Sequence, residues 1–288
     1  MTAALVLCGL VHTAAAMALF GGLAVRPVLG VGSGEAERRL TLSAAVIALL
    51  TAVVWLLVEV ADMASSPAAM LDPGMIRTVL GDTAFGRVWL GRLILSVAVV
   101  GVALRGNPNR PRLLLELAAV QLASLALVGH SSMAEGLAGA LQRANQSLHL
   151  LAGGAWLGAL PPLLIVLARA RRSGLPGELE TALRRFSGFG AIAVAILLAT
   201  GSVNVWVRTG GGHGLFTTPY GATLQVKLAL VATMIALALL NRMVLTPRLK
   251  RPAAHPLRWL TLSLTVETLV GVLVLGAAFA LGNSEPPP

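Results

Sequence analysis

The chain has 288 residues, of which 56% are hydrophobic and only 12% are charged, and its mean hydropathy is +0.82. A typical soluble domain has about 25% charged residues, so this composition excludes an ordinary soluble globular protein. Most of the chain is therefore expected to lie in a lipid bilayer.

Eight apolar stretches are long enough to cross that bilayer. The hydrocarbon core is about 30 Å thick, which takes roughly 20 helical residues. The stretches cover residues 5–29, 40–64, 88–104, 113–128, 147–167, 186–207, 224–245 and 260–281. None alternates with the period of two that is typical of barrel strands, so we predict an all-α integral membrane protein. The first stretch lacks preceding basic residues and a small-residue cleavage site, which favours a retained helix over a signal peptide.

The basic residues predict the orientation of these helices. Sixteen of the 22 Lys and Arg residues lie in or beside the odd-numbered connections. Positive residues stay on the cytoplasmic side, so both termini are expected to be extracytoplasmic. The net charge of +10 is then mostly a topology signal, and nucleic acid is not an expected partner because the chain lacks a soluble basic face.

The two halves of the chain repeat each other. His12 precedes Gly21 by nine residues, and His149 precedes Gly158 by nine residues. Further matches are Arg38-Arg39 with Arg184-Arg185, Thr83-Ala-Phe-Gly86 with Thr218-Pro-Tyr-Gly221, and Arg92-Leu with Lys227-Leu. These matches predict two four-helix repeats, residues 1–144 and 145–288, in the same membrane orientation and related by a pseudo-two-fold axis along the membrane normal.

Polar residues inside the apolar stretches, or at their ends, gather near the predicted outer surface. They are His12, Glu59, Asp62, Arg92, His130, His149, Asn204 and Lys227. An Arg, Lys or Asp at the centre of a membrane helix costs about 2.5–3.5 kcal/mol, so such residues usually turn inward and find partners. A polar pocket that opens outward is therefore expected.

The residue types in this layer are typical of metal ligands. Three His with a carboxylate suit a transition metal, and thiol or thioether groups suit Cu(I). The candidate ligands are His12, His130, His149, Glu59 and Met133. Candidates for a pathway or for supporting contacts are Cys8, Asp62, Arg92, Asn204, Lys227 and Glu267.

Plainer roles remain open for several of these residues. Cys8 also fits as a small packing residue, and His12 and His149 as helix-to-helix hydrogen bonds worth about 0.6–2 kcal/mol. Arg92 and Lys227 either extend to the interface or pair with Glu59 or Asp62. Glu267, near mid-membrane without a basic neighbour in sequence, is either protonated or on a conduction route. No common catalytic motif is present, so we do not expect an enzyme.

The second half resembles a known family. The segments that carry the resemblance are His149-Leu-Leu-Ala-Gly-Gly-Ala-Trp-Leu-Gly158, Thr200-Gly-Ser-Val-Asn204, Thr218-Pro-Tyr-Gly221, Lys227-Leu and Asn241-Arg242. Their order and spacing are similar to those of the CopD/PcoD copper-resistance membrane proteins. The resemblance implies a bacterial inner-membrane protein that takes copper from the periplasm and moves it inward, with His130 and His149 in contact with copper.

The combined prediction is a copper-handling protein with an outward pocket that holds Cu(I) or Cu(II). Expected partners are the copper ion, a periplasmic copper chaperone, the lipid bilayer and a second copy of the chain. Three alternatives stay open: a copper donor to an assembly factor, a b-type haem protein with His12 and His149 as axial ligands, and a purely structural subunit.

Overall fold

The computed structural model describes residues 2–30, 34–105, 111–128, 135–173, 176–211, 215–249 and 255–284. All regular structure in these ranges is helical. This confirms the predicted all-α class.

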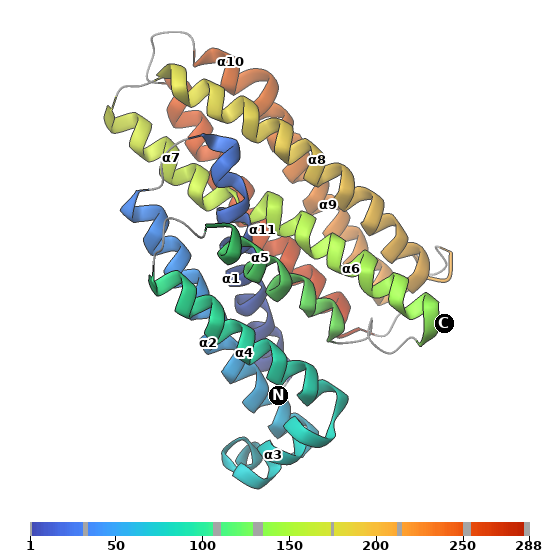
Figure 1. Cartoon of the computed structure of the whole chain (residues 1–288). Helices are drawn as coiled ribbons and strands as arrows, with labels where there is room; N and C mark the ends of the chain where they lie inside the picture. The colour runs from blue at the N-terminus through green and yellow to red at the C-terminus, as the bar shows by residue number, and fades with distance from the viewer. Residues whose placement is uncertain are drawn as a thin grey trace.

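Eleven α-helices form the described bundle. Those of the first half are α1 (Thr2–Leu29), α2 (Glu35–Met63), α3 (Pro73–Asp82), α4 (Ala84–Arg105) and α5 (Pro111–Ala123), with 3₁₀ turns at Pro67–Leu71 and Ser124–Leu127. The others are α6 (Gly136–Leu157), α7 (Leu160–Ser173), α8 (Pro176–Arg208), α9 (Pro219–Leu240), α10 (Thr246–Arg248) and α11 (His255–Gly282), with a π-helical turn at Asn241–Leu245. In Figure 1, α2 and α4 lie on one side of the bundle, α8 and α9 lie on the other, and α1 lies between them.

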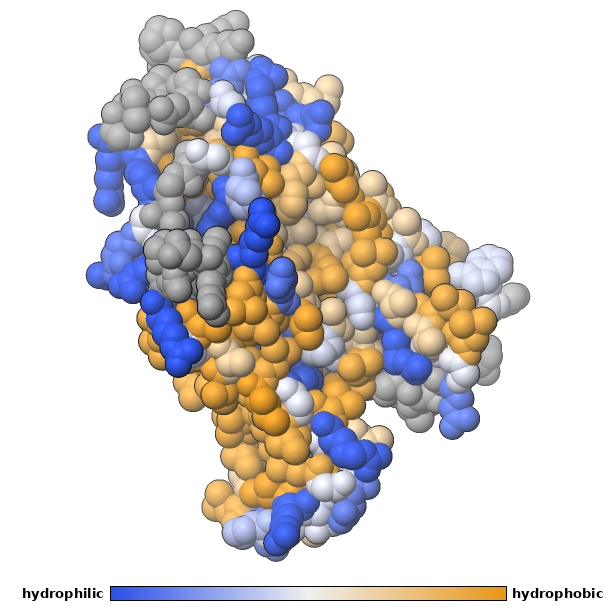
Figure 2. Space-filling view, viewed as in Figure 1, coloured by the Kyte–Doolittle hydropathy of each residue, from blue (hydrophilic) through white to orange (hydrophobic). Residues whose placement is uncertain are grey.

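Seven described segments are long and apolar enough to cross a membrane. They are Ala3–Leu29, Glu35–Met63, Ala84–Arg105, Gly136–Arg172, Leu179–Arg208, Pro219–Arg248 and Leu257–Gly282. The eighth predicted stretch, 113–128, forms the 13 residues of α5 and a four-residue 3₁₀ turn, which is shorter than the others. Apolar side chains cover the middle of the molecule in Figure 2, and polar ones gather at its ends, as expected for a surface that faces lipid.

Helix α1 lies at the centre of the bundle and crosses α6 at very short range. A Cβ atom on Gly21 would lie 2.1 Å from the Gly154 carbonyl oxygen, and one on Gly158 would lie 1.8 Å from the Met17 carbonyl oxygen. No side chain fits there, because both obstacles are backbone atoms. Small residues at such crossings let membrane helices approach closely and gain van der Waals contact.

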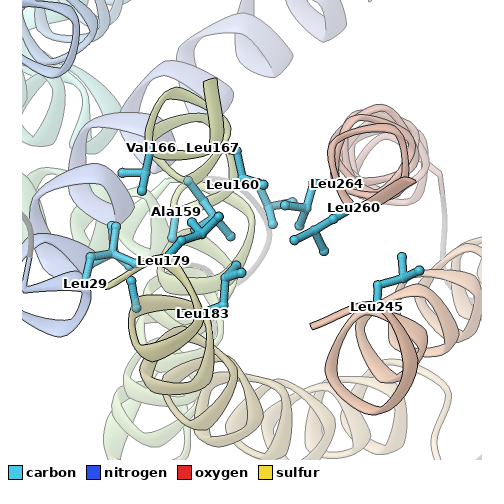
Figure 3. Close-up of a cluster of buried hydrophobic side chains, with 13 residues drawn as sticks. Leu29, Ala159, Leu160, Val166, Leu167, Leu179, Leu183, Leu245, Leu260 and Leu264 are labelled. Carbon is cyan, nitrogen blue, oxygen red and sulfur yellow. The ribbon is translucent and has the colours of Figure 1, made fainter. Parts of the chain in front are cut away.

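The opposite end of the bundle from α3 is closed by apolar packing. Figure 3 shows side chains from α1, α7, α8 and α11 that converge on one another. The fully buried members include Leu160, Leu163 and Leu167 of α7 and Leu260 and Leu264 of α11. Close packing of this kind leaves few voids among these side chains.

An ion pair joins the two halves at the same end. Arg169 of α7 donates to both carboxylate oxygens of Glu37 on α2, at 2.6 and 2.5 Å. The Glu37 side chain is 7% exposed and also accepts from the backbone of Gly34 at 3.0 Å. The pair thereby links two helices that are far apart in sequence.

Replacing Glu37 by Gln should lower the free energy of unfolding by about 1 kcal/mol, because hydrogen bonds to a charged group in a half-buried pair contribute more than exposed ones. Thermal unfolding in detergent, followed by tryptophan fluorescence, measures the change. The matched control is Glu35→Gln two residues away, whose side chain is 51% exposed although it contacts Arg38 and Arg39. Equal shifts for the two variants would contradict the assignment.

Candidate metal centre

His12 lies at the core of the first half. Its ring is fully buried, and Nδ1 lies 2.9 Å from the Ala48 carbonyl oxygen and 3.1 Å from Thr51 Oγ1. Nε2 lies 2.8 Å from a terminal nitrogen of Arg92. A carbonyl only accepts and a guanidinium only donates, so Nδ1 carries the hydrogen and Nε2 is the acceptor. Both nitrogens of His12 are therefore occupied.

Arg92 is turned into the protein instead of toward the interface. Arg92 is 2% exposed. Besides its hydrogen bond to His12, its guanidinium donates to the Gln121 carbonyl oxygen at 3.0 Å and to Ser124 Oγ. The guanidinium also lies 5.2 Å from the centre of the Trp89 ring. All these partners are neutral, so neither expected role, extension to the interface or pairing with Glu59 or Asp62, describes its position.

His149 forms a similar centre in the second half. Its Nδ1 lies 2.9 Å from Thr200 Oγ1, and the ring also has a hydrogen-bonding contact with the Leu197 backbone. Thr200 donates its own hydroxyl hydrogen to the Ile196 carbonyl oxygen at 2.7 Å, so it accepts from Nδ1. The ring is half-buried, and Gly201 leaves room beside it, since a Cβ there would lie 3.4 Å from Cε1.

The same contacts recur in both centres. Thr51 donates to Ile47 as Thr200 donates to Ile196, and each threonine faces the histidine of its own half. One helical turn before each histidine, a side chain donates to the backbone oxygen of that threonine. The two donors are Cys8, at 3.2 Å, and Asn145, at 3.1 Å.

The basic partner differs between the centres. Arg92 binds the Nε2 atom of His12, whereas Lys227, its counterpart in sequence, lies within electrostatic range of His149. In the His149 centre, Nδ1 of the ring faces Thr200 Oγ1, as Nδ1 of His12 faces Thr51 Oγ1.

The remaining outer residues lie around these centres. Glu59 is half-buried and accepts a hydrogen bond from the Trp55 side chain, while Asp62 is exposed. Asn204 accepts from Asn145 at 2.9 Å and donates to Gln146 at 2.9 Å. These contacts place Asn204 in the His149 centre and Glu59 near the His12 centre.

Two of the candidate ligands, His130 and Met133, lie outside the described residues. Within the part of the chain that the structure describes, no group of three or more His, Cys, Asp or Glu side chains is close enough together to hold a metal ion.

Glu267 lies apart from the outer residues, in α11. It is 1% exposed and accepts from Trp156 at 3.0 Å and from Asn241 at 3.2 Å. Both donors are neutral, and neither belongs to the two histidine centres.

The residues that sequence reasoning missed are the threonines and the side chains that surround Arg92. Thr51 and Thr200 end two similar segments, Ile-Ala-Leu-Leu-Thr51 and Ile-Leu-Leu-Ala-Thr200, so a signal for them was present. Nothing in the sequence points to Gln121 or Ser124 as partners of Arg92, because those contacts depend on how α4 packs against α5.

These features define an all-helical membrane protein with one threonine-bound histidine in each half. Residues 1–140 match the copper resistance protein D-like N-terminal domain, and residues 180–281 match the copper resistance protein D domain. The chain belongs to the copper resistance protein D family, which is a family of membrane proteins and not a known enzyme class.

Three curated relatives support this assignment. The inner membrane protein YebZ of Escherichia coli K12 is 34% identical over 86% of this chain and 84% of its own length. Copper resistance protein D of Pseudomonas syringae pv. tomato is 31% identical over 94% of this chain and 91% of its own. The copper transport protein CutJ of Bacillus subtilis is 28% identical over 75% of this chain and 40% of its own length. No solved structure matches the chain.

Proposed function

We propose that this protein binds copper in the outward half of the inner membrane and moves it across the membrane as cargo. The observation that carries the proposal is the His149 ring, whose Nδ1 is bound to Thr200; Nε2 is the nitrogen proposed to bind the metal. Metal-bound histidines are commonly oriented in this way, with the second nitrogen donating to an acceptor of the protein. The names of two relatives, a copper resistance protein and a copper transport protein, support copper as the metal.

One imidazole does not hold copper alone. His130 and Met133 precede α6 in sequence and are the proposed further ligands at His149, and Glu59 is the proposed carboxylate ligand near His12. An imidazole and thioether set favours Cu(I), whereas imidazole with carboxylate favours Cu(II). The ligand set therefore decides which oxidation state the site prefers.

His12 is the proposed second copper contact, available when Arg92 moves away. The guanidinium occupies the side of Nε2 that a metal would use. Two cations cannot share one lone pair, so copper and Arg92 exclude each other at His12. Cys8, which bonds to the same segment of α2, lies one turn away and offers a sulfur ligand for Cu(I).

The proposed architecture is two parallel four-helix repeats, residues 1–144 and 145–288, with α5 as the eighth crossing. The matched contacts of the two histidine centres support the repeat. Gly21 and Gly158 are equivalent in the proposed repeat and touch each other's helices, as residues beside a two-fold axis would. Gly9 of α1 lies against Phe279 of α11, so both terminal helices have their free ends on one side, which agrees with an even number of crossings and extracytoplasmic termini.

The proposed route enters past Asn204, which lies one turn closer to the outer end of α8 than Thr200, and leads from the His149 centre toward the opposite end of the bundle. Leucine side chains of α7 and α11 pack together at that end, so we expect these helices to move when copper is released. Copper would reach the outer side from a periplasmic copper chaperone, and a second copy of the chain is a further expected partner.

The test is a titration of the purified protein in detergent with Cu(I) against a competing chelator, after recording the absorbance spectrum. We expect a flat Soret region and tight binding of copper, followed by copper uptake into liposomes that contain the protein. A Soret band would instead establish the haem alternative. Absence of both signals would leave only a structural role, and binding without uptake would favour a copper donor.

Thr200→Val should weaken copper binding by about 10- to 100-fold, the usual cost of losing the partner that orients a ligating histidine. The substitution keeps the shape of the side chain but removes the acceptor of Nδ1. Thr223→Val is the matched control, because Thr223 is half-buried in the same half but bonds only within its own helix, to Pro219. Equal affinities of the two variants in the chelator competition would contradict the orientation argument.

A further inference from the structure

We propose that Glu267 is a proton-binding site inside the membrane, and that it exchanges hydrogen-bond roles with Asn241 when it gains or loses its proton. The proposal goes beyond the copper site and needs no copper to be tested. It rests on the geometry around the carboxyl group, on two unpaired polar atoms beside it, and on a distortion of α9 at Asn241.

The carboxyl group is held by neutral donors alone. Trp156 donates to Oε1 at 3.0 Å and Asn241 donates to Oε2 at 3.2 Å, and Glu267 is 1% exposed. A negative charge in lipid is costly unless a cation or a proton neutralises it. A site with two neutral donors stabilises the carboxylate only in part, so a proton is the remaining means of neutralisation.

No charged group of the described residues faces this carboxyl. The groups that act on it are Trp156 and Asn241, within the part of the chain that the structure describes. The titratable residues on the elements around α11 are Cys8, His12 and Arg26 on α1, Arg143 and His149 on α6, Arg169, Arg171 and Arg172 on α7, Tyr220 and Lys227 on α9, Arg242 on the π-helical turn and Arg248 on α10. Arg242, next to Asn241 in sequence, is exposed and donates to the Ser187 carbonyl oxygen at 3.5 Å.

Two buried oxygens beside the carboxyl have no hydrogen-bond partner. They are Oδ1 of Asn241 and Oγ of Ser263, one helical turn before Glu267. Both can accept a hydrogen bond, and an acceptor is what a protonated carboxyl needs. Unpaired buried polar atoms are rare in folded proteins, so their presence beside an acidic group points to a second hydrogen-bonded state.

The two states differ by one proton and one rotation. In the charged state, the Asn241 amide nitrogen donates to Oε2, as described. When Oε2 takes a proton from a hydronium ion, water is released and an O–H bond forms on Glu267. The Asn241 amide then turns so that Oδ1 accepts from that O–H group, and loss of the proton to water reverses both changes.

The backbone of α9 gives Asn241 room for this exchange. Asn241 begins the π-helical turn that follows α9. Such turns insert extra backbone into a helix and are frequent at functional sites. The wider turn places the Asn241 side chain toward α11, where Glu267 lies.

The test is infrared difference spectroscopy of the copper-free protein in lipid between high and low pH. We expect a carbonyl band of a protonated carboxylic acid to appear on acidification, to shift when glutamate is labelled with ¹³C, and to disappear in Glu267→Gln. Asn241→Ala should move the band to higher frequency, because the acid loses its acceptor. Glu116→Gln, which removes an exposed carboxyl of α5, is the control and should leave the band in place.

Two results would overturn the proposal. One is a spectrum in which no buried glutamic acid titrates, which the isotope label reports even if Glu267→Gln fails to fold. The other is a band that persists unchanged in Glu267→Gln. Neither result bears on copper binding at His149, so failure of this proposal and failure of the copper site are distinguishable.

Discussion

Gly158→Ala should destabilise the protein by about 3 kcal/mol or more, the largest stability effect that we expect from a single added methyl group. The new Cβ would lie 1.8 Å from the Met17 carbonyl oxygen, far inside van der Waals contact. Because that oxygen belongs to the backbone of α1, only separation of α1 and α6 relieves the clash. Gly21→Ala should act in the same way, since its Cβ would meet the Gly154 carbonyl oxygen at 2.1 Å.

The measurement is thermal unfolding in detergent together with the yield of monodisperse protein. Gly22→Ala is the matched control, because a Cβ there has Pro162 at 3.8 Å as its nearest neighbour. That variant should be neutral or slightly more stable, since alanine favours helix over glycine by about 1 kcal/mol. If Gly21→Ala and Gly22→Ala unfold at the same temperature, the tight crossing of α1 and α6 is refuted.

Hydropathy alone was sufficient to predict most of the membrane-spanning helices. Length and apolar content decide whether a segment crosses a bilayer, and both are written in the sequence. The stretch 113–128 tests the limit of this rule, because its helix α5 stops after 13 residues and continues as a 3₁₀ turn. Where a helix changes geometry near its end depends on tertiary contacts, which hydropathy does not report.

The histidine centres were predictable in part. Equal spacing from His12 to Gly21 and from His149 to Gly158 pointed to equivalent positions, and both residues do bond to a threonine on the next spanning helix. The partner of Arg92 was not predictable, because a long basic side chain in a membrane either extends to water or turns inward. Packing against α5, which supplies the Gln121 carbonyl and Ser124, decides between these directions.

The two centres differ in one consequential respect. The permanently charged guanidinium of Arg92 donates a hydrogen bond to Nε2 of His12, whereas Lys227 lies within electrostatic range of His149. Arginine presents a rigid fork of donors, and lysine a single flexible ammonium that moves more readily. In the proposed function, the first half is thus closed by its own cation, and the second half is the one proposed to accept copper.

His149→Ala should weaken copper binding by about 100-fold or more, which corresponds to about 2.7 kcal/mol. The variant removes the histidine whose Nε2 faces the proposed copper ion. Competition with a Cu(I) chelator measures the loss, and the unfolding temperature is recorded beside it to exclude a general loss of structure. In His12→Ala we expect near-normal copper affinity but lower stability, because Arg92 loses a buried partner at 2.8 Å. The reverse order of copper affinities would place the primary site in the first half.

Replacing Arg92 by Met should open the centre at His12 to copper. The change removes the competing hydrogen bond to Nε2 and also a positive charge beside the proposed metal position. A hydrogen bond to a charged group contributes about 1.5–3 kcal/mol, which copper no longer has to overcome at His12. Copper binding at His12 should therefore tighten by about 10- to 100-fold, and Met adds a thioether that favours Cu(I). In His149→Ala, this second change should restore part of the lost affinity. Arg92→Lys, which keeps the charge, is the control and should restore none; equal rescue by Lys and Met would show that Arg92 does not block His12.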